Sequence, residues 1–218
     1  RAHKYFNNFR ITKCADINQN AANKCAKINK IKAVTIKELL SDTDIKIILN
    51  LTIPAAHYEV AKQALLNGKH VYSEKPLAIN FQDGKKLIKL AKKKKLYVGN
   101  APDTFLGGGS QKSRDLLDKK VIGKVIFGNA IFAYPGIQSY HPNPESWFAK
   151  KGGGPVVDMG PYYLTALVNL LGPAKEVLSQ SEKGKETRVI GIGPKKGKKF
   201  KVMCPTTYFS TIGFLNGT

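Results

Sequence analysis

The tetrapeptide "SEKP", residues 73–76, places a carboxylate, an amine and a proline where an apolar strand is expected to end. A side chain held at such a place can take a proton from a reacting group or give one to it. Lys75 can do so where burial or a neighbouring cation favours the neutral amine. The alternative is an ordinary solvated lysine on a basic surface turn. Its place at a strand end makes Lys75 the first candidate catalytic residue.

A second group of polar side chains lies about 80 residues further along the chain. Asp158 and Tyr162 are four residues apart across a predicted helix start, so they share one face of that helix. Asp158 is placed to accept hydrogen bonds from substrate hydroxyls or to orient Lys75, and its alternative role is to cap the helix. Tyr162 can donate a proton or position a substrate.

The segment "SYHPNPESWF" has the composition of a sugar-binding loop. Trp147 can stack on the C–H face of a sugar ring, and polar groups such as His141 can recognise hydroxyls. The glycines at residues 152–154 allow a tight turn or a close approach of backbone to ligand. His141 and Trp147 are therefore candidate substrate-binding residues.

The elements that must position these side chains alternate between strand and helix over the first two-fifths of the chain. We predict strands at residues 9–17, 44–52, 69–76 and 96–101, and helices at residues 18–29, 35–42, 54–68 and 81–95. Alternation of this kind predicts βαβ units with right-handed crossovers, and hence a parallel sheet.

Ligands of such sheets bind beyond the carboxyl ends of the strands. The polar residues expected there are Asp16, Asn50, Thr52, Glu74, Lys75, Asn100 and Asp103. A carboxylate at Asp16 can accept hydrogen bonds from both hydroxyls of a ribose and would repel a 2′-phosphate, so it favours NAD over NADP. The alternative for Asp16 is an Asx turn, and the alternative for Asn50 and Thr52 is helix capping.

A dinucleotide-binding sheet normally begins with a strand, a Gly-rich turn and a helix. No GxGxxG precedes the first predicted strand, and residues 1–9 resemble the end of a helix. In the Rossmann strand order the first strand is central, so its absence would leave two neighbouring strands with unpaired edges. We therefore expect this chain to be a fragment of a protein that continues in both directions.

The regular alternation of predicted strands and helices ends near Phe105. We predict a Gly-rich loop and helix at residues 107–123, a long strand at 124–136, a long loop at 139–160 and a helix at 161–172, followed by strands and turns. This is an α+β pattern. We expect a Rossmann domain over residues 1–104 and a second domain over residues 105–218.

The composition excludes some classes of protein. A hydrophobic fraction of 42% over 218 residues supports a packed core. No apolar run approaches a membrane span, and the first residues are not a secretory signal. The cysteines Cys14, Cys25 and Cys204 lack CxxC spacing, which indicates free thiols in a reducing compartment. The net charge of +21 comes from scattered lysines with few arginines, which favours a solvated surface over a specific nucleic-acid site.

Four segments together resemble the glucose–fructose oxidoreductase / inositol dehydrogenase / rhizopine catabolism (Gfo/Idh/MocA) family: "CADI", "NLTIPAAHYEVAKQALLNGKHVYSEKPLA", "APDTFLGGG" and "GGGPVVDMGPYYLTALVNLLGP". They occur in the family's order over nearly the whole chain. The resemblance implies a Rossmann domain followed by a domain with a mostly antiparallel sheet, and hydride transfer between a nicotinamide and a sugar, inositol or related polyol.

The resemblance also implies roles for particular residues. Those expected to contact the cofactor are Asp16, Asn50, Thr52, Pro54, His57, Glu74, Lys75, Pro76 and Asn100, with a cis bond between Lys75 and Pro76. His57 is equally well explained as a structural histidine. Where many members carry DxGxH, this chain has Tyr162 in place of the histidine, and His141 is a candidate to supply the missing imidazole.

The sequence thus predicts a cytoplasmic NAD-dependent oxidoreductase of a sugar or polyol. Its catalytic residues are Lys75, Asp158 and Tyr162, and its substrate also contacts His141 and Trp147. We expect no metal, no membrane and no specific nucleic-acid partner, and a homo-oligomer formed through the C-terminal sheet. Two alternatives remain: a non-catalytic dinucleotide-binding sensor or co-regulator of the same fold, and a polyanion-binding module driven by the charge.

Overall fold

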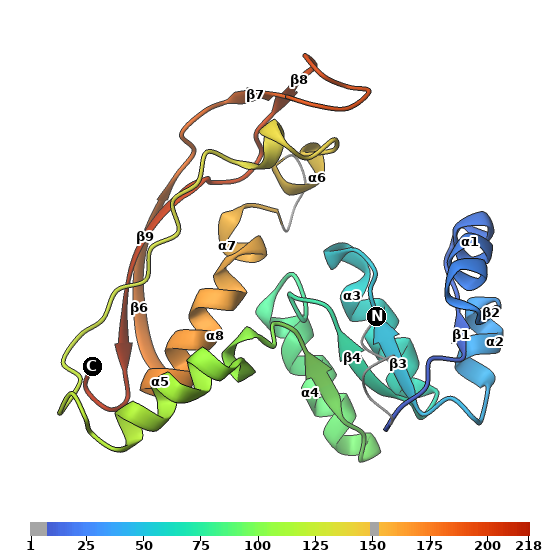
Figure 1. Ribbon diagram of the computed structural model, residues 1–218, viewed down its shortest axis with the longest axis horizontal. Helices are drawn as coiled ribbons and strands as arrows, with labels where there is room; N and C mark the ends of the chain where they lie inside the picture. Colours follow the sequence, from blue (N-terminus) through green and yellow to red (C-terminus); the bar gives the residue numbers. More distant parts are fainter. Residues whose placement is uncertain (1–7, 149–152) are drawn as a thin grey trace.

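A computed structural model of the protein describes residues 8–148 and 153–218 (Figure 1). The predicted helix end at residues 1–9 lies almost wholly outside the described residues. The same holds for the first of the three glycines at residues 152–154.

The first half has the predicted alternation of strands and helices. Its elements are β1 (Lys13–Cys14), α1 (Gln19–Asn29), β2 (Lys32–Ala33), α2 (Ile36–Ser41), β3 (Ile47–Asn50), α3 (Pro54–Leu66), β4 (His70–Ser73), α4 (Phe81–Lys94) and β5 (Val98–Asn100). All strand pairs in this half are parallel, which confirms the α/β class.

Local signals explain where these helices begin. Thr35 and Glu38 form a capping box at α2, in which each side chain bonds the backbone of the other. Asn80 caps α4, and Pro54 occupies the first turn of α3. The faces that α3 and α4 turn inward meet β3 and β4 in one apolar core, formed by Ile48, Ala61, Ala64, Leu65, Val71, Leu87 and Ala91.

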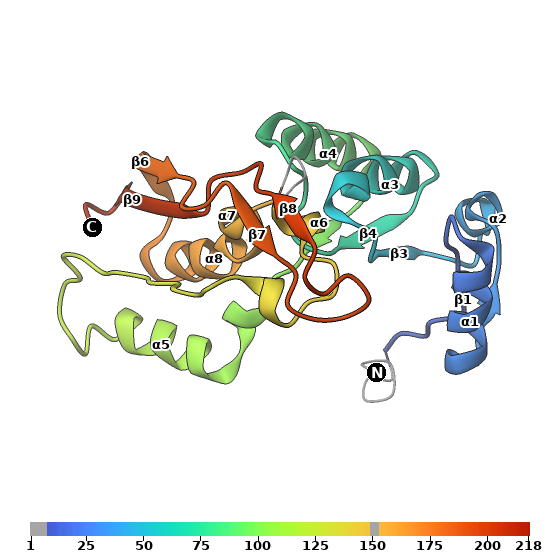
Figure 2. The same ribbon diagram turned by 90° about the horizontal axis from the view of Figure 1, so that it is seen from above.

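The parallel strands form two sheets, because β1 and β3 are not paired. One sheet has the order β1–β2 and the other β3–β4–β5. Figures 1 and 2 both show the first pair, with α1 and α2, standing apart from the second sheet. An unpaired edge here is what a Rossmann order without its first strand would give. Alternate side chains of β3 point to opposite faces, so Ile48 meets the core under α3 and α4 while Ile47 and Leu49 are exposed on the other face.

The second half is the predicted α+β region. It contains η2 (Thr104–Leu106), α5 (Gly108–Asp118), η3 (Ile137–Ser139), α6 (Glu145–Phe148), α7 (Pro155–Asp158), α8 (Gly160–Leu171), β6 (Ala174–Glu182), β7 (Thr187–Val189), β8 (Lys199–Lys201) and β9 (Thr207–Phe214). Strands β6 and β9 form an antiparallel pair, as do β7 and β8. Arg114 of α5 donates to the carbonyls of Asn169 and Leu170, which joins α5 to the end of α8.

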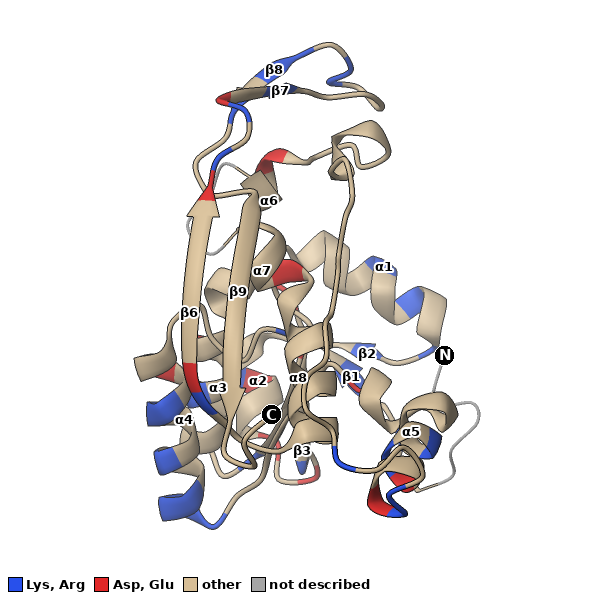
Figure 3. Ribbon diagram, turned by 90° about the vertical axis from the view of Figure 1, so that its left-hand side faces the viewer, with Lys and Arg blue, Asp and Glu red and all other residues tan. Residues whose placement is uncertain are grey.

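Three sequence predictions are wrong in detail. The strand predicted at residues 9–17 is only two residues long, and β2 was not predicted. The strand predicted at 124–136 is absent: the segment runs lengthwise beside the β6–β9 pair in Figures 1 and 3 without joining its ladder. The loop predicted at 139–160 contains the short helices α6 and α7. Strand formation depends on a neighbour that supplies hydrogen bonds, and a local pattern does not show whether one is present.

The positive charge is spread over helices, strands and loops, with one concentration on α4. Figure 3 shows lysines along the outer side of α4, whereas the strands β6 and β9 carry few charges. Within residues 8–148 and 153–218, no helix has the length and apolar character needed to cross a membrane.

Candidate active site

Lys75 and Asp158 meet between the two halves of the molecule. The Lys75 Nζ atom lies 2.6 Å from Asp158 Oδ1 and 2.6 Å from the Asp158 backbone carbonyl oxygen. Their side chains are only 14% and 27% exposed. Lys75 follows β4 and Asp158 ends α7, so this ion pair joins the carboxyl edge of the parallel sheet to the second half of the chain. The structure therefore brings together the two residues that the sequence singled out for catalysis.

Tyr162 presents its ring, rather than its hydroxyl, to this pair. The Lys75 Nζ atom lies 5.2 Å from the centre of the Tyr162 ring, within the range of a cation–π contact. The ammonium is thus held by a carboxylate, a carbonyl and an aromatic face. In this arrangement the Tyr162 ring can help to orient the Lys75 ammonium.

The backbone that carries Lys75 is fixed by the neighbouring strand ends. The Glu74 amide donates to the carbonyl of Asn50 at 2.9 Å. The side chain of Asn100 donates to the carbonyls of Ser73 and Glu74 at 3.0 and 2.9 Å. The Lys75–Pro76 peptide bond is cis, as expected. Asn100, the last residue of β5, therefore supports the loop that carries Lys75 (residues 74–76, the lysine loop).

His57 and Asn50 also contact the loop that carries Lys75, residues 74–76. His57 is 1% exposed, and its ring nitrogens Nδ1 and Nε2 lie 2.6 Å from the Pro76 carbonyl and 2.9 Å from the Thr52 carbonyl. Asn50, also 1% exposed, donates to the His57 carbonyl at 3.0 Å and accepts from the Thr52 hydroxyl at 2.7 Å. These contacts match the structural alternative for His57. The helix capping considered for Asn50 and Thr52 is not seen, because the N-cap of α3 is Ile53 and no side chain caps that helix. A direct contact of His57 or Asn50 with a cofactor stays a prediction.

The other candidate cofactor residues are exposed at strand ends, Asp16 in the separate β1–β2 sheet and the others after β3 and β4. Asp16 follows β1, and its Oδ1 accepts the amide of Asn18 at 2.8 Å, so the Asx turn considered above is present. Pro54 starts α3 and is exposed, as are Thr52 and Glu74. The Glu74 carboxylate also accepts the Lys75 amide at 3.1 Å, which braces the turn.

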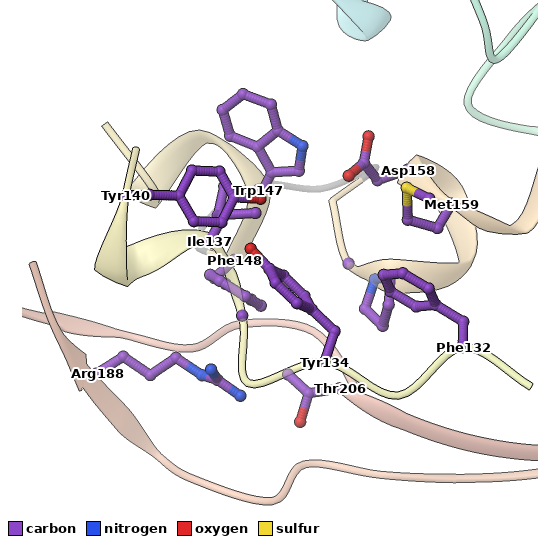
Figure 4. Close-up of a pocket in the computed structure, with 13 residues that line it drawn as sticks. Phe132, Tyr134, Ile137, Tyr140, Trp147, Phe148, Asp158, Met159, Arg188 and Thr206 are labelled. Carbon is purple, nitrogen blue, oxygen red and sulfur yellow. The ribbon is translucent and has the colours of Figure 1, made fainter. Parts of the chain in front are cut away.

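An aromatic cavity of about 240 Å³ opens beside Asp158 (Figure 4). Trp147 and Asp158 line it, as the sequence predicted for substrate contacts. His141 does not line it: its ring packs edge-on against Trp147, with ring centres 4.5 Å apart, and its Nδ1 accepts the Asn143 amide. A substrate contact of His141 stays a prediction. The other lining residues are Phe132, Tyr134, Gly136, Ile137, Tyr140, Phe148, Gly154, Pro155, Met159, Arg188 and Thr206.

Tyr134 is a cavity residue that sequence reasoning missed. Loss of solvent, together with the neighbouring Tyr140 hydroxyl and the negative charge of Asp158, raises the pKa of Tyr134 to about 12. Its phenol is therefore neutral near pH 7 and can donate a hydrogen bond to a substrate hydroxyl. The sequence predicts a strand over residues 124–136, which ends within the segment "IFAYPGIQSY". The signal in it was the concentration of aromatic residues beside proline and glycine.

Comparison with protein families matches both halves of the chain. Residues 1–101 match the family described as "Oxidoreductase family, NAD-binding Rossmann fold", and residues 110–198 match the "GFO/IDH/MocA C-terminal domain". Together the two matches cover most of the 218 residues.

Individual relatives and solved structures agree with these matches. The trans-1,2-dihydrobenzene-1,2-diol dehydrogenase of Xenopus laevis is 34% identical over 126 residues, 58% of this chain and 37% of its own. The D-xylose dehydrogenase of Paenarthrobacter nicotinovorans is 25% identical over 76% of this chain and 43% of its own. The chain thus spans less than half of each of these curated relatives. The WlbA dehydrogenase of Bordetella pertussis, solved with NADH and UDP-GlcNAcA, shares the fold, with a TM-score of 0.75 at 18% identity over 95% of this chain and 57% of its own.

Proposed function

The chain belongs to the GFO/IDH/MocA oxidoreductase family, and from this premise we propose that it transfers hydride between NAD and a secondary alcohol or ketone of a sugar, inositol or related polyol. The observation that carries the proposal is the Lys75–Asp158 pair. It places an amine with exchangeable protons at the carboxyl edge of the parallel sheet, beside a cavity of a size and composition that suit a sugar ring.

Lys75 is the group that we propose exchanges the substrate proton. In ketone reduction its ammonium donates a proton to the developing alkoxide, and in alcohol oxidation its neutral amine accepts the hydroxyl proton. The Asp158 carboxylate compensates the charge of the ammonium and fixes its direction, since Nζ is bonded to both Oδ1 and the backbone oxygen of the same residue. Tyr134 and Trp147 line the cavity and are placed to bind hydroxyls and a ring face.

The exposed residues at the sheet edge fit part of NAD. Thr52 lies between Leu51 and Ile53, which are 71% and 64% exposed, so this strand end presents an apolar surface with a polar centre. Asp16 presents a carboxylate with one oxygen engaged by Asn18. When bound, NAD would supply or accept the hydride. Asp16, Thr52, Pro54 and Glu74 would hold it, whereas the chain contains no Gly-rich turn for the pyrophosphate.

The substrate class rests on the cavity and on the names of the relatives. One relative is named for a cyclic diol and another for D-xylose, and both are compounds with neighbouring hydroxyl groups. The test is a screen of sugars, inositols and diols with NAD and NADP, followed through nicotinamide absorbance. We expect turnover with at least one polyol. Tight binding of NAD without turnover of any of them would instead favour the non-catalytic sensor.

Replacing Asp16 with alanine is expected to weaken the preference for NAD over NADP by about 10–100-fold. The carboxylate is proposed to accept hydrogen bonds from the ribose hydroxyls and to repel a 2′-phosphate, so its loss acts on both cofactors in opposite directions. The measurement is the ratio of kcat/KM for the two cofactors. Asp44→Ala, an exposed carboxylate between α2 and β3, is the control. An unchanged ratio in Asp16→Ala would show that Asp16 serves only the Asx turn.

Replacing Tyr162 separates a proton-relay role from a positioning role. If the ring face is what Lys75 uses, Tyr162→Phe should keep kcat within about threefold, because phenylalanine preserves the cation–π contact. Tyr162→Leu should lower kcat by about tenfold, since it removes that contact. A large loss in Tyr162→Phe would assign the hydroxyl to proton transfer.

Assembly and location complete the proposal. We propose a homo-oligomer formed through the β6–β9 pair, on which Val177, Leu178 and Phe209 are more than half exposed. A cytoplasmic location and the division into domains at residue 104 stay predictions from sequence.

A further inference from the structure

Arg188 of β7 lines the aromatic cavity on the side away from Asp158 (Figure 4). Its Nη1 donates to the carbonyl of Pro135 at 2.7 Å and to the side-chain oxygen of Gln138 at 3.0 Å. Its guanidinium carbon lies 4.6 Å from the centre of the Phe148 ring. These contacts hold the guanidinium in one orientation at the cavity wall.

The charge of Arg188 is not matched by a carboxylate. Within the part of the chain that the structure describes, its hydrogen-bond acceptors are neutral and it takes part in no ion pair. The acidic residue that lines the cavity, Asp158, is already compensated by Lys75. A guanidinium partly removed from water without a counter-charge is costly, and an anion that binds beside it recovers that cost.

The guanidinium also has donors left over. Its contacts with Pro135 and Gln138 use only Nη1. Among the described residues Nε is buried without a partner, and Nη2 has no hydrogen-bond acceptor. A purely structural arginine that only fastened residues 135–138 to β7 would need Nη1 and the stacking on Phe148, but not these remaining donors. A planar pair of donors suits the two oxygens of a carboxylate or a phosphate.

We propose that Arg188 is a specificity-determining residue that binds an anionic group, carboxylate or phosphate, carried by the sugar or polyol substrate. This inference rests on the proposed function, because it assigns the far end of the same substrate. The reacting hydroxyl lies at Lys75 and Asp158, the ring lies among Tyr134 and Trp147, and the anion lies at Arg188. The cavity then has a cationic end that selects acidic sugars over neutral ones.

The test compares matched substrates in the NAD-loaded protein. The pairs are methyl β-D-glucuronide with methyl β-D-glucoside, and glucose 6-phosphate with glucose, which separate carboxylate from phosphate recognition. We expect kcat/KM to favour a charged member over its neutral partner by about 10–100-fold, the usual range for a charge-assisted hydrogen-bonded contact. Arg188→Met should remove that preference mainly through KM, while turnover of the neutral member stays within about threefold. Arg188→Lys should restore part of it.

The control variant is Lys201→Met, which removes one exposed positive charge from the neighbouring strand β8, outside the cavity. It should leave the preference unchanged, which excludes an effect of net charge. Equal kcat/KM for charged and neutral substrates in the wild type would overturn the inference and leave the proposed function standing. An equal loss of kcat/KM for the charged and neutral substrates in Arg188→Met, with a lowered melting temperature, would also overturn the inference. That result would show that Arg188 only stabilises the fold.

A separate measurement covers the case in which no probe is turned over, an outcome that counts against the proposed function. Calorimetry then compares binding of the same glucuronide and glucose 6-phosphate to the wild type and to Arg188→Met. Binding of an anionic probe that is weakened at least tenfold by the substitution supports the inference. Absence of any difference refutes it.

Discussion

Replacing Lys75 with methionine is expected to lower kcat by about 10²–10⁴-fold, the range that general acid–base catalysis contributes. Methionine fills much of the same space but cannot carry the substrate proton. It also leaves Asp158 without its cation. Affinity for NAD should change little, because Asp16, Thr52 and Pro54 lie at other strand ends. The measurements are single-turnover kinetics with the best polyol of the screen and fluorescence titration with NADH.

Two further variants make the Lys75 prediction specific. Lys75→Arg keeps a cation for Asp158, but a guanidinium does not release its proton at ordinary pH. If proton exchange is the role of Lys75, Lys75→Arg should be nearly as slow as Lys75→Met. If Lys75 serves only to hold Asp158, arginine should restore much of the rate. Lys89→Met, an exposed lysine of α4, controls for the loss of one charge and should be fully active. Turnover of Lys75→Met within threefold of wild type would refute the catalytic role.

Much of the parallel half could be predicted because its signals are local. The capping box at Thr35, the proline of α3 and the apolar spacing of α4 each act over a few residues, and all three helices are present. The family and its NAD-binding fold, inferred from the strand-end motif and the later "GGGPVVDMG", are confirmed by the matches over residues 1–101 and 110–198.

Features that depend on a distant partner could not be predicted in the same way. Residues 124–136 have the composition of a strand, but a strand needs a neighbour in register, and no strand among the described residues pairs with this segment. The ion pair of Lys75 with Asp158 joins two segments 83 residues apart, and the sequence offered it as one of two functional roles for Asp158 without a local pattern that decides between them. Arg188 was missed because no residue near it in the sequence indicates that β7 lies beside residues 135–138. The rarity of arginine in this lysine-rich chain was the one available signal.

The site also depends on the buried residue His57, and replacing it is expected to have the largest effect on stability. His57→Leu should lower the free energy of unfolding by about 1–3 kcal/mol. Leucine has a similar volume, so the loss comes from the part-buried carbonyls of Pro76 and Thr52, which face the two ring nitrogens; an imidazole with one N–H donates to one of them. A group left without its donor costs about 1–3 kcal/mol. Urea unfolding followed by circular dichroism measures the change.

The controls for His57 use the same kind of side chain. His70 of β4 is half-buried, and its Nδ1 accepts the Tyr97 amide at 3.0 Å, a donor that water can reach when the ring is removed. His70→Leu should therefore cost less than about 1 kcal/mol. His57→Gln, whose amide can donate to one of the two carbonyls, should recover part of the stability lost in His57→Leu. Equal stability of His57→Leu and wild type would show that the two carbonyls find other partners.

A consequence for catalysis follows from the same contacts. The Pro76 carbonyl that faces His57 belongs to the residue after Lys75, and the Thr52 carbonyl belongs to the adjacent strand end. Loss of this bridge lets the lysine loop move relative to β3 while the ion pair with Asp158 can persist. We therefore expect His57→Leu, assayed well below its melting temperature, to lower kcat by about tenfold with little change in KM, since misplacement of a catalytic group by an ångström costs rate. An enzyme that was destabilised but turned over at the wild-type rate would assign His57 to folding alone.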